Sequence, residues 1–201
     1  MFGDRKRGKG KLLFLLVVIF LFISWLSFSV LADSCNSNKI ALLGDSITVG
    51  WGPQFIQSCG NQPINYAVSG KWTPWMLTKL KSEILNKGYT HLIVLGGTND
   101  ISGGKSAPDV IANLEQIYFL ARNNNIKVIA GTIPPYNKQN SVEKNNVVKE
   151  INVWIRTQKE IGNIGGVVDF YQLLVSQEPC MNSNYASSCG NVHPNTAGYQ
   201  A

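Results

Sequence analysis

The sequence predicts an α/β protein, a three-layer α/β/α sandwich built on a five-stranded parallel sheet with flavodoxin-like strand order. Short apolar segments alternate with longer segments in which apolar residues recur every three or four positions. These are the patterns of buried strands and amphipathic helices. Alternation of the two along a chain favours a parallel sheet with helices on both faces.

Five strands are expected, and each ends in glycine or in polar residues. They are predicted at residues 40–43, 63–68, 90–95, 127–130 and 166–169. Because the carboxyl ends of parallel strands meet at one edge of the sheet, the polar residues that follow them should gather there. That edge is where we expect the function to lie.

Helices are expected between the strands and after the last one. They are predicted at residues 54–57, 73–88 and 106–123, around residues 147–155, and from about residue 195. Residues 50–53 are expected to form a loop. Thr73 is predicted as an N-cap with Pro74 in the first turn, and Ser106 with Asp109 as a capping box. The chain stops at Ala201, so we expect the last helix to be truncated.

The first 32 residues have the features of a targeting segment. A basic head precedes an unbroken apolar run over residues 12–23, and small and apolar residues continue to Ala32. This pattern is typical of a signal peptide cleaved before Asp33. Residues 12–32 are also long enough for an uncleaved membrane anchor, which needs roughly 20 residues. Both interpretations export residues 33–201, which we expect to form one domain and a monomer, secreted or tethered to the outer face of the membrane.

Charge gives little sign of a macromolecular partner. The net charge is +6, but five of the 18 basic residues precede residue 12. From Asp33 onward 13 basic residues face 11 acidic ones, which leaves +2. No basic stripe argues for nucleic acid.

Four cysteines lie in the exported part, and an even number in an oxidising compartment suggests disulfides. Three pairings are possible, and we favour the local pairs Cys35–Cys59 and Cys180–Cys189. A zinc site is the weaker interpretation, because no Cys-x-x-Cys spacing occurs and histidine is scarce. No metal is expected.

The polar residues after the first three strands are suited to acyl transfer. Ser46 follows the first strand, Gly70 the second and Asn99 the third. A serine hydroxyl is a nucleophile once a base takes its proton. The backbone N–H groups of Ser46 and Gly70 and the Asn99 side chain could stabilise an oxyanion. The alternative is that Ser46 merely caps a helix, since serine is preferred at that position.

Only two histidines are available as the base. His91 opens the third strand at its amino end, so we expect a structural role. His193 lies in a loop after the fifth strand and is the histidine that could reach Ser46. Asp45, Asp100 and Asp169 also lie near strand ends.

Four blocks of this sequence together resemble the SGNH hydrolases, also called the GDSL esterase/lipase family. The blocks are Gly44-Asp45-Ser46, Gly70, Gly97-Thr98-Asn99-Asp100 and Val192-His193-Pro194-Asn195-Thr196-Ala197-Gly198-Tyr199. The resemblance runs from about residue 39 to residue 201 and implies ester hydrolysis without metal or organic cofactor. It implies Ser46 as nucleophile, His193 as base, and Ser46, Gly70 and Asn99 as oxyanion donors. It also suggests that Asp45 and Asp100 bond loop amides. Asp169 lies at a strand end, and we expect it to fix a loop as well.

One departure concerns the group that orients His193. The family usually has an aspartate three residues before the histidine, where this chain has Gly190. Two interpretations follow. Either a backbone carbonyl holds the imidazole and leaves a Ser46–His193 dyad, or the activity is weak.

The resulting functional expectation is an exported serine esterase. Its substrates would be small acyl esters, acetyl or short-chain, of carbohydrates or lipids such as a lysolipid. The alternative is a catalytically impaired carbohydrate- or lipid-binding module on the same fold.

Overall fold

The computed structural model describes residues 35, 38–60, 62–136, 142–175, 181–186 and 191–200. Its centre is a sheet with the strand order β2-β1-β3-β4-β5, and every neighbouring pair of strands is parallel. The strands are β1 (Ile40–Gly44), β2 (Ile64–Asn65), β3 (His91–Leu95), β4 (Lys127–Gly131) and β5 (Gly166–Val168). The predicted parallel, flavodoxin-like sheet is therefore confirmed.

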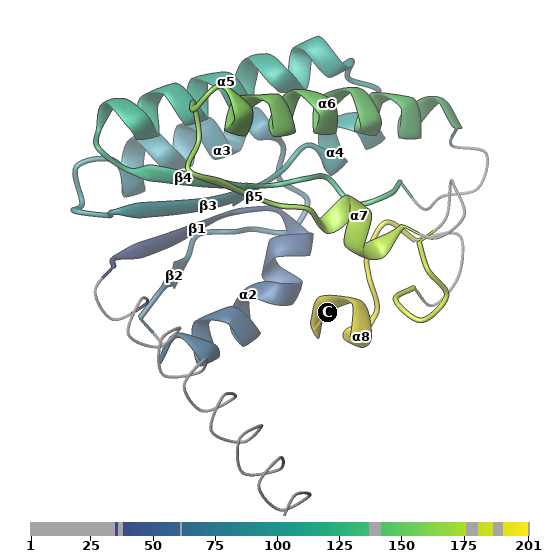
Figure 1. The fold of residues 1–201 in the computed structure, drawn as a ribbon, viewed down its shortest axis with the longest axis horizontal. Coiled ribbons are helices and arrows are strands. Elements are labelled where there is room, and N and C mark those ends of the chain that lie inside the picture. The colour runs from purple at the N-terminus through teal and green to yellow at the C-terminus, as the bar shows by residue number, and fades with distance from the viewer. Residues whose placement is uncertain are drawn as a thin grey trace, which may run out of the picture.

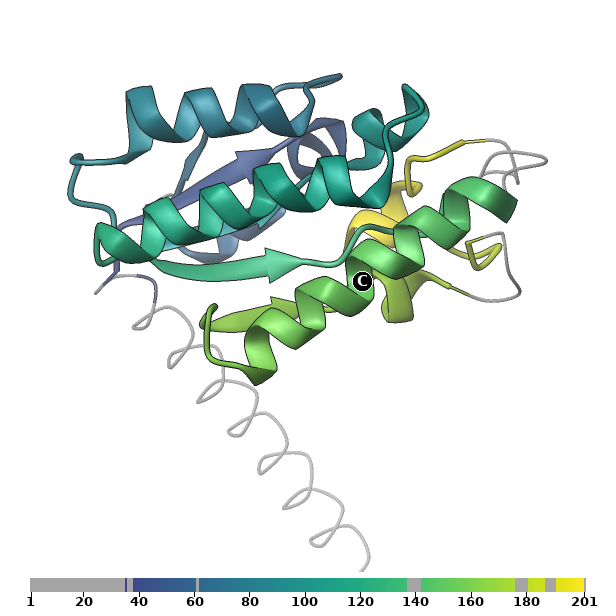
Figure 2. The same ribbon diagram turned by 90° about the horizontal axis from the view of Figure 1, so that it is seen from above.

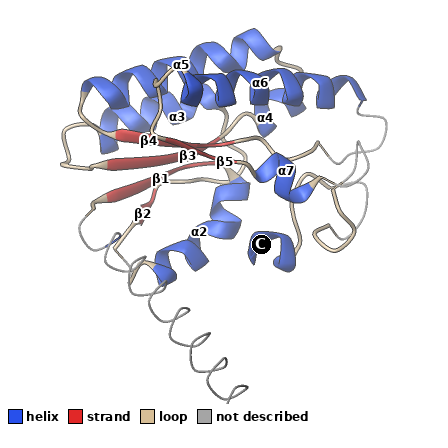
Figure 3. Ribbon diagram, viewed as in Figure 1, coloured by secondary structure: helices blue, strands red, loops and turns tan. Residues whose placement is uncertain are grey.

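Helices cover the sheet on both faces, as Figures 1 and 3 show. They are α2 (Ser46–Ser58), α3 (Thr73–Lys79) with the π-helical continuation η1 (Leu80–Ile84), α4 (Thr98–Ser102), α5 (Ala107–Asn123), α6 (Val142–Glu160), α7 (Phe170–Leu174) and α8 (Thr196–Gln200). Helices α3, α5 and α6 lie side by side on one face, which Figure 2 shows from above. Helices α2 and α8 lie on the other face. This is the predicted three-layer sandwich.

Successive residues of the central strands point alternately into two hydrophobic cores, one on each face of the sheet. Ala41 and Leu43 of β1 face the core under α3, α5 and α6, together with Leu92 and Val94 of β3. The residues between them face the smaller core under α2, and these are Ile40, Leu42, Ile93 and Leu95. Successive strand residues point to opposite faces, so an apolar run without interruption fits a strand buried on both sides.

The loop predicted at residues 50–53 is wrong, because these residues lie within helix α2. The structure has one helix from Ser46 to Ser58, with Pro53 inside it. Gly50 and Gly52 permit close approach of neighbouring segments. A Cβ on Gly50 would lie 2.4 Å from the ring of Tyr199, and one on Gly52 would lie 2.5 Å from Nδ2 of Asn65. Gly50 and Gly52, which suggested a loop, therefore allow Tyr199 and Asn65 to pack closely against α2.

Two further predictions were wrong in detail. The strand expected over residues 63–68 has only two residues in β2, although the N–H groups of Tyr66 and Val68 still donate to β1 carbonyls. Thr73 is the first residue of α3 rather than its N-cap. Its hydroxyl instead donates to Asp100 over 2.6 Å. Helices α4 and α7, one turn or so each, were not predicted.

The disulfide Cys35–Cys59 is present, as predicted. The proposed pair Cys180–Cys189 and the targeting segment of residues 1–32 lie outside the described residues. Within the ranges given above, none of the helices combines the length and apolar character needed to cross a membrane.

Candidate active site

Ser46 and His193 meet at the carboxyl edge of the sheet. The Ser46 Oγ lies 2.7 Å from Nε2 of His193, although the two residues are 147 positions apart in the chain. Ser46 begins α2 directly after β1, and His193 lies just before α8. Both side chains are partly buried. At this distance the imidazole nitrogen is within reach of the serine proton.

Strand order explains why these residues meet here. The chain passes from β1 to β2 on one side and then returns to place β3 on the other side of β1. Such a reversal leaves a crevice outside the carboxyl ends of the two strands. Ser46 follows β1 and Asn99, in α4, follows β3.

Asp45 fixes the turn that carries Ser46. It is the N-cap of α2, and its Oδ1 accepts the N–H of Ile47 over 2.9 Å. The side chain is only 1% exposed. Burial, opposed by the Ile47 hydrogen bond and reinforced by the nearby charge of Asp100, raises the pKa of Asp45 to about 6. Asp45 thus has the structural role expected of it, as the cap of the helix that begins with Ser46.

Asn99 is held by two acceptors. Its Nδ2 donates to Oδ2 of Asp45 over 3.2 Å and to the backbone carbonyl of Lys71 over 3.1 Å. The Asp45 contact fixes the amide at the edge where Ser46 lies. An amide nitrogen has two hydrogens, so both are engaged in this structure.

Ser46 and Gly70, the two residues whose backbone N–H groups were predicted as oxyanion donors, follow β1 and β2. Ser46 is the first residue of α2, so its N–H has no acceptor within the helix and lies at the positive end of the helix dipole. Gly70 is in the turn after β2 with a φ of +74°, and no atom lies within 4 Å of where its Cβ would be. A side chain at this position would be strained by the backbone, although space is available.

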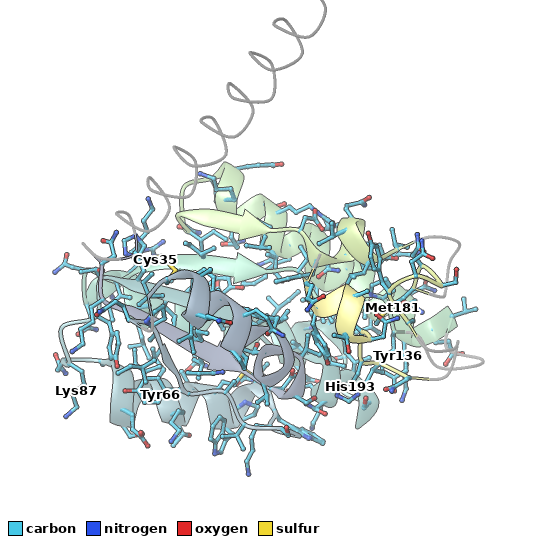
Figure 4. The ribbon with its side chains drawn as sticks, turned by 90° about the horizontal axis from the view of Figure 1, so that it is seen from below. Cys35, Tyr66, Lys87, Tyr136, Met181 and His193 are labelled. Carbon is cyan, nitrogen blue, oxygen red and sulfur yellow. A yellow bond between two sulfur atoms is a disulfide. The ribbon has the colours of Figure 1, made fainter. Side chains whose placement is uncertain are left out.

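The loop of His193 is fastened by Asn195. The Asn195 N–H donates to the carbonyl of Tyr185 over 2.7 Å, and its Nδ2 donates to the carbonyl of Asn184 over 3.0 Å. Its Oδ1 accepts the N–H of Gly198 over 2.9 Å, as an N-cap of α8 does. Three bonds from one residue thus fix the chain two positions beyond the histidine. Figure 4 shows His193 among the side chains of this edge.

Asn191 contacts His193 from within the same loop. Its Oδ1 lies 2.9 Å from Nδ1 of His193 and accepts the backbone N–H of His193 over 3.1 Å. Among the described residues, the contact of His193 Nδ1 is to the side-chain oxygen of Asn191 and not to a backbone carbonyl. Asn191 was not predicted as a site residue, although an asparagine two residues before the histidine is a local signal for such a bond. Gly190, at the usual aspartate position, lies outside the described residues.

A sequence profile of the GDSL-like lipase/acylhydrolase family matches residues 42–201, most of the chain. The chain belongs to this family. The match includes Ser46, Asn99 and His193 and supports hydrolase activity. No curated protein sequence matches significantly.

Solved structures of GDSL proteins share the fold of this GDSL-like chain. A GDSL-like lipase from Bacteroides thetaiotaomicron has a TM-score of 0.69 at 22% identity, over 86% of this chain and 91% of that one. A GDSL-family lipolytic protein from Veillonella parvula has a TM-score of 0.69 at 27% identity, over 80% and 91%. A mutant of an acetyl-xylooligosaccharide esterase from Geobacillus Stearmophilus has a TM-score of 0.63 at 16% identity, over 81% and 89%.

Other polar residues of the GDSL-like domain serve its loops. Asp100 accepts the N–H and the hydroxyl of Thr73. Asp169 accepts hydrogen bonds from the hydroxyl of Thr132 and from Nε and Nη2 of Arg156, with which it forms an ion pair. Burial raises the pKa of Asp169, but its hydrogen bonds and the charge of Arg156 outweigh burial and lower that pKa. Both aspartates therefore have the loop-fixing roles expected of them.

The remaining histidine and one cavity lie away from Ser46. His91 starts β3 and lies 3.0 Å from the hydroxyl of Thr90, and burial together with Lys127 lowers its pKa. A cavity of about 450 Å³ is lined by residues near the amino ends of β1 and β3, including Lys39 and Lys87. In Figure 4, Lys87 lies at the opposite end of the molecule from His193. Among the described residues, His, Cys, Asp and Glu form no group of three that could hold a metal.

Proposed function

We propose that this chain is an exported serine esterase in which Ser46 is the nucleophile and His193 the general base. The observation that carries the proposal is the 2.7 Å separation of Ser46 Oγ and His193 Nε2. That contact joins a serine at a helix N-terminus to the one histidine at this edge of the described structure. General bases work from this distance.

The reaction follows from the positions of these groups. As Ser46 Oγ attacks the carbonyl carbon of the ester, its proton moves to Nε2 of His193. The carbonyl oxygen becomes an oxyanion, which accepts hydrogen bonds from the N–H groups of Ser46 and Gly70 and from Nδ2 of Asn99. His193 then returns the proton to the alcohol oxygen, the ester C–O bond breaks, and an acyl-Ser46 intermediate remains.

Water completes the cycle. His193 takes a proton from a water molecule, whose oxygen attacks the acyl carbon. The second tetrahedral species then breaks its bond to Ser46 Oγ, which regains the proton from His193. The products are a carboxylic acid and the free enzyme, and no metal or organic cofactor takes part.

The proposed substrates are small acyl esters of carbohydrates or lipids. The Geobacillus Stearmophilus relative named above is an acetyl-xylooligosaccharide esterase, which supports a short acyl group on a sugar. Gly70 and Trp72 are exposed beside the proposed oxyanion site, and Trp72 is 38% exposed. An exposed indole and an open glycine suit a bulky alcohol portion that remains outside the site.

The test is hydrolysis of p-nitrophenyl esters of increasing acyl length by the purified residues 33–201. We expect acetyl and butyryl esters to be cleaved fastest and Ser46→Ala to abolish the reaction. Ser58→Ala is the matched control, because Ser58 is an exposed serine at the other end of α2. Equal hydrolysis by the Ser46→Ala protein, or none by the folded wild type, would contradict the proposal. In the latter case a non-catalytic binding module becomes the better interpretation.

A further inference from the structure

Asn191 contacts the base from the side opposite Ser46. We propose that Asn191 is the positioning residue of His193 and that its side-chain oxygen takes the place of the missing aspartate. The inference rests on the proposed esterase function and names a residue two positions before the histidine. Its basis is the pair of contacts from one oxygen, 2.9 Å to Nδ1 and 3.1 Å to the backbone nitrogen of His193.

The backbone contact fixes which atom of the Asn191 amide faces the ring. A backbone N–H can only donate, so the atom of Asn191 that it meets must be the acceptor, Oδ1. The ring nitrogen Nδ1 meets that same oxygen and must therefore carry a proton. A neutral imidazole protonated on Nδ1 is unprotonated on Nε2.

This tautomer is the one that catalysis requires. Nε2 faces Ser46 Oγ at 2.7 Å and must be free to accept the serine proton. In the contacts from Asn191 through His193 to Ser46, Nδ1 of His193 therefore donates to Asn191, and Nε2 is free to accept the proton of Ser46. Asn191 itself touches neither the serine nor the reacting carbonyl.

The same oxygen also fixes the backbone of the histidine. An asparagine side chain that accepts the N–H two residues later forms a local turn. Asn191 thus restrains the main chain and the ring of His193 together. Asn195, described above, fastens the chain on the other side of the histidine.

An amide orients the imidazole but stabilises its charged form less than a carboxylate does. Bonds to a charged acceptor are roughly twice as strong as neutral ones. Asn191 is exposed, so water can replace part of the bond if the side chain is removed. We therefore expect Asn191→Ala to lower kcat by about 10- to 100-fold, less than the roughly 10⁴-fold loss when a buried triad aspartate is disabled.

The experiment compares Asn191→Ala and Asn191→Asp with Asn123→Ala. Asn123 is an exposed asparagine at the end of α5, on the face of the sheet opposite α8. It is the control and should keep the wild-type kcat. The kcat of Asn191→Asp should equal or exceed the wild-type value. The acid limb of its pH profile of kcat/KM should move to higher pH, because a carboxylate stabilises the imidazolium.

A second readout does not depend on activity. The chain has two histidines, so 15N-histidine labelling in the His91→Gln background reports the ring of His193 alone. We expect the Nδ1–H tautomer to dominate when Asn191 is present and in the Asn191→Asp variant, and the Nε2–H tautomer to gain in Asn191→Ala. An unchanged tautomer and unchanged kcat in Asn191→Ala would overturn the inference. An Nδ1–H tautomer that depends on Asn191, in a protein without hydrolysis, would uphold the positioning role and reject the esterase proposal.

Discussion

The side-chain nitrogen of Asn99 donates to the carbonyl oxygen of Lys71 over 3.1 Å. Its other acceptor is the Asp45 carboxyl, which also caps α2. One residue therefore links the ends of β1 and β3 to the turn after β2. An oxyanion formed at Ser46 has to compete with the Lys71 carbonyl for one hydrogen of Asn99.

Replacement of Asn99 tests whether this amide acts in the reaction. We expect Asn99→Ala to lower kcat by about 100- to 1000-fold, the usual cost of removing one oxyanion donor. KM should change little, because the donor gains strength mainly in the transition state. Asn113→Ala is the control, because Asn113 is a half-buried residue of α5 whose side chain donates to the carbonyl of Asp109 in the same helix. A kcat within about twofold of wild type would remove Asn99 from the proposed oxyanion site.

Close packing of α2 against α8 gives a second prediction. A Cβ on Gly50 would lie 2.4 Å from the Tyr199 ring, so Gly50→Ala should displace α8 and with it the nearby His193. We expect kcat/KM to fall by about 10- to 100-fold, since misplacement by 1 Å can cost about 100-fold. Val49→Ala in the same helix is the control.

A double variant separates displacement from a general loss of stability. Alanine is a better helix former than glycine by roughly 1 kcal/mol, so Gly50→Ala need not destabilise α2 itself. Gly50→Ala combined with Tyr199→Ala removes the clash and should recover activity relative to Gly50→Ala alone. Additive losses in the double variant would mean that the contact is not the cause.

Asp45 predicts a pH dependence of stability. Its pKa is about 6 in the folded protein against 3.8 as the ordinary value, so between these pH values the folded state holds a proton that the unfolded state has lost. The free energy of unfolding should therefore fall as pH rises from about 4 to about 6, by an amount of order 3 kcal/mol. Below about pH 4 both states are protonated, so Asp45 causes no further change with pH.

Urea unfolding of wild type and Asp45→Asn across this range measures the effect. The difference in free energy, variant minus wild type, should increase with pH. In a series extended to lower pH, Asp109→Asn should show the opposite sign below the ordinary carboxyl value of 3.8, because the Ser106 bonds lower the pKa of Asp109 and its contribution is lost as pH falls through that range. A difference for Asp45→Asn that does not change with pH would contradict the account of its burial.

Much of the site was predictable because parallel strands deliver their carboxyl ends to one edge. That rule alone predicted one edge for Ser46, Gly70 and Asn99, and it distinguished His193 from His91. Local rules also predicted the capping box at Ser106, which the structure confirms.

The missed features depend on contacts between distant segments. The helical state of residues 50–53 depends on the close approach of Tyr199 and Asn65, which no local propensity reveals. Thr73 was predicted as an N-cap from its neighbours alone. Its hydroxyl donates instead to Asp100, which is 27 positions away and is not revealed by local rules. The Asn-x-His pattern indicates a local hydrogen bond from Asn191, but the prediction considered only the position one residue earlier, where the family usually has an aspartate.

Activation of Ser46 by His193 is tested most directly by the rate of covalent labelling with a fluorophosphonate, with the adduct located by mass spectrometry. We expect labelling on Ser46 in the wild type and in His91→Ala, and a large loss of labelling rate in His193→Ala. A folded wild-type protein that does not label, or a His193→Ala protein that labels at the wild-type rate, would contradict this role of His193.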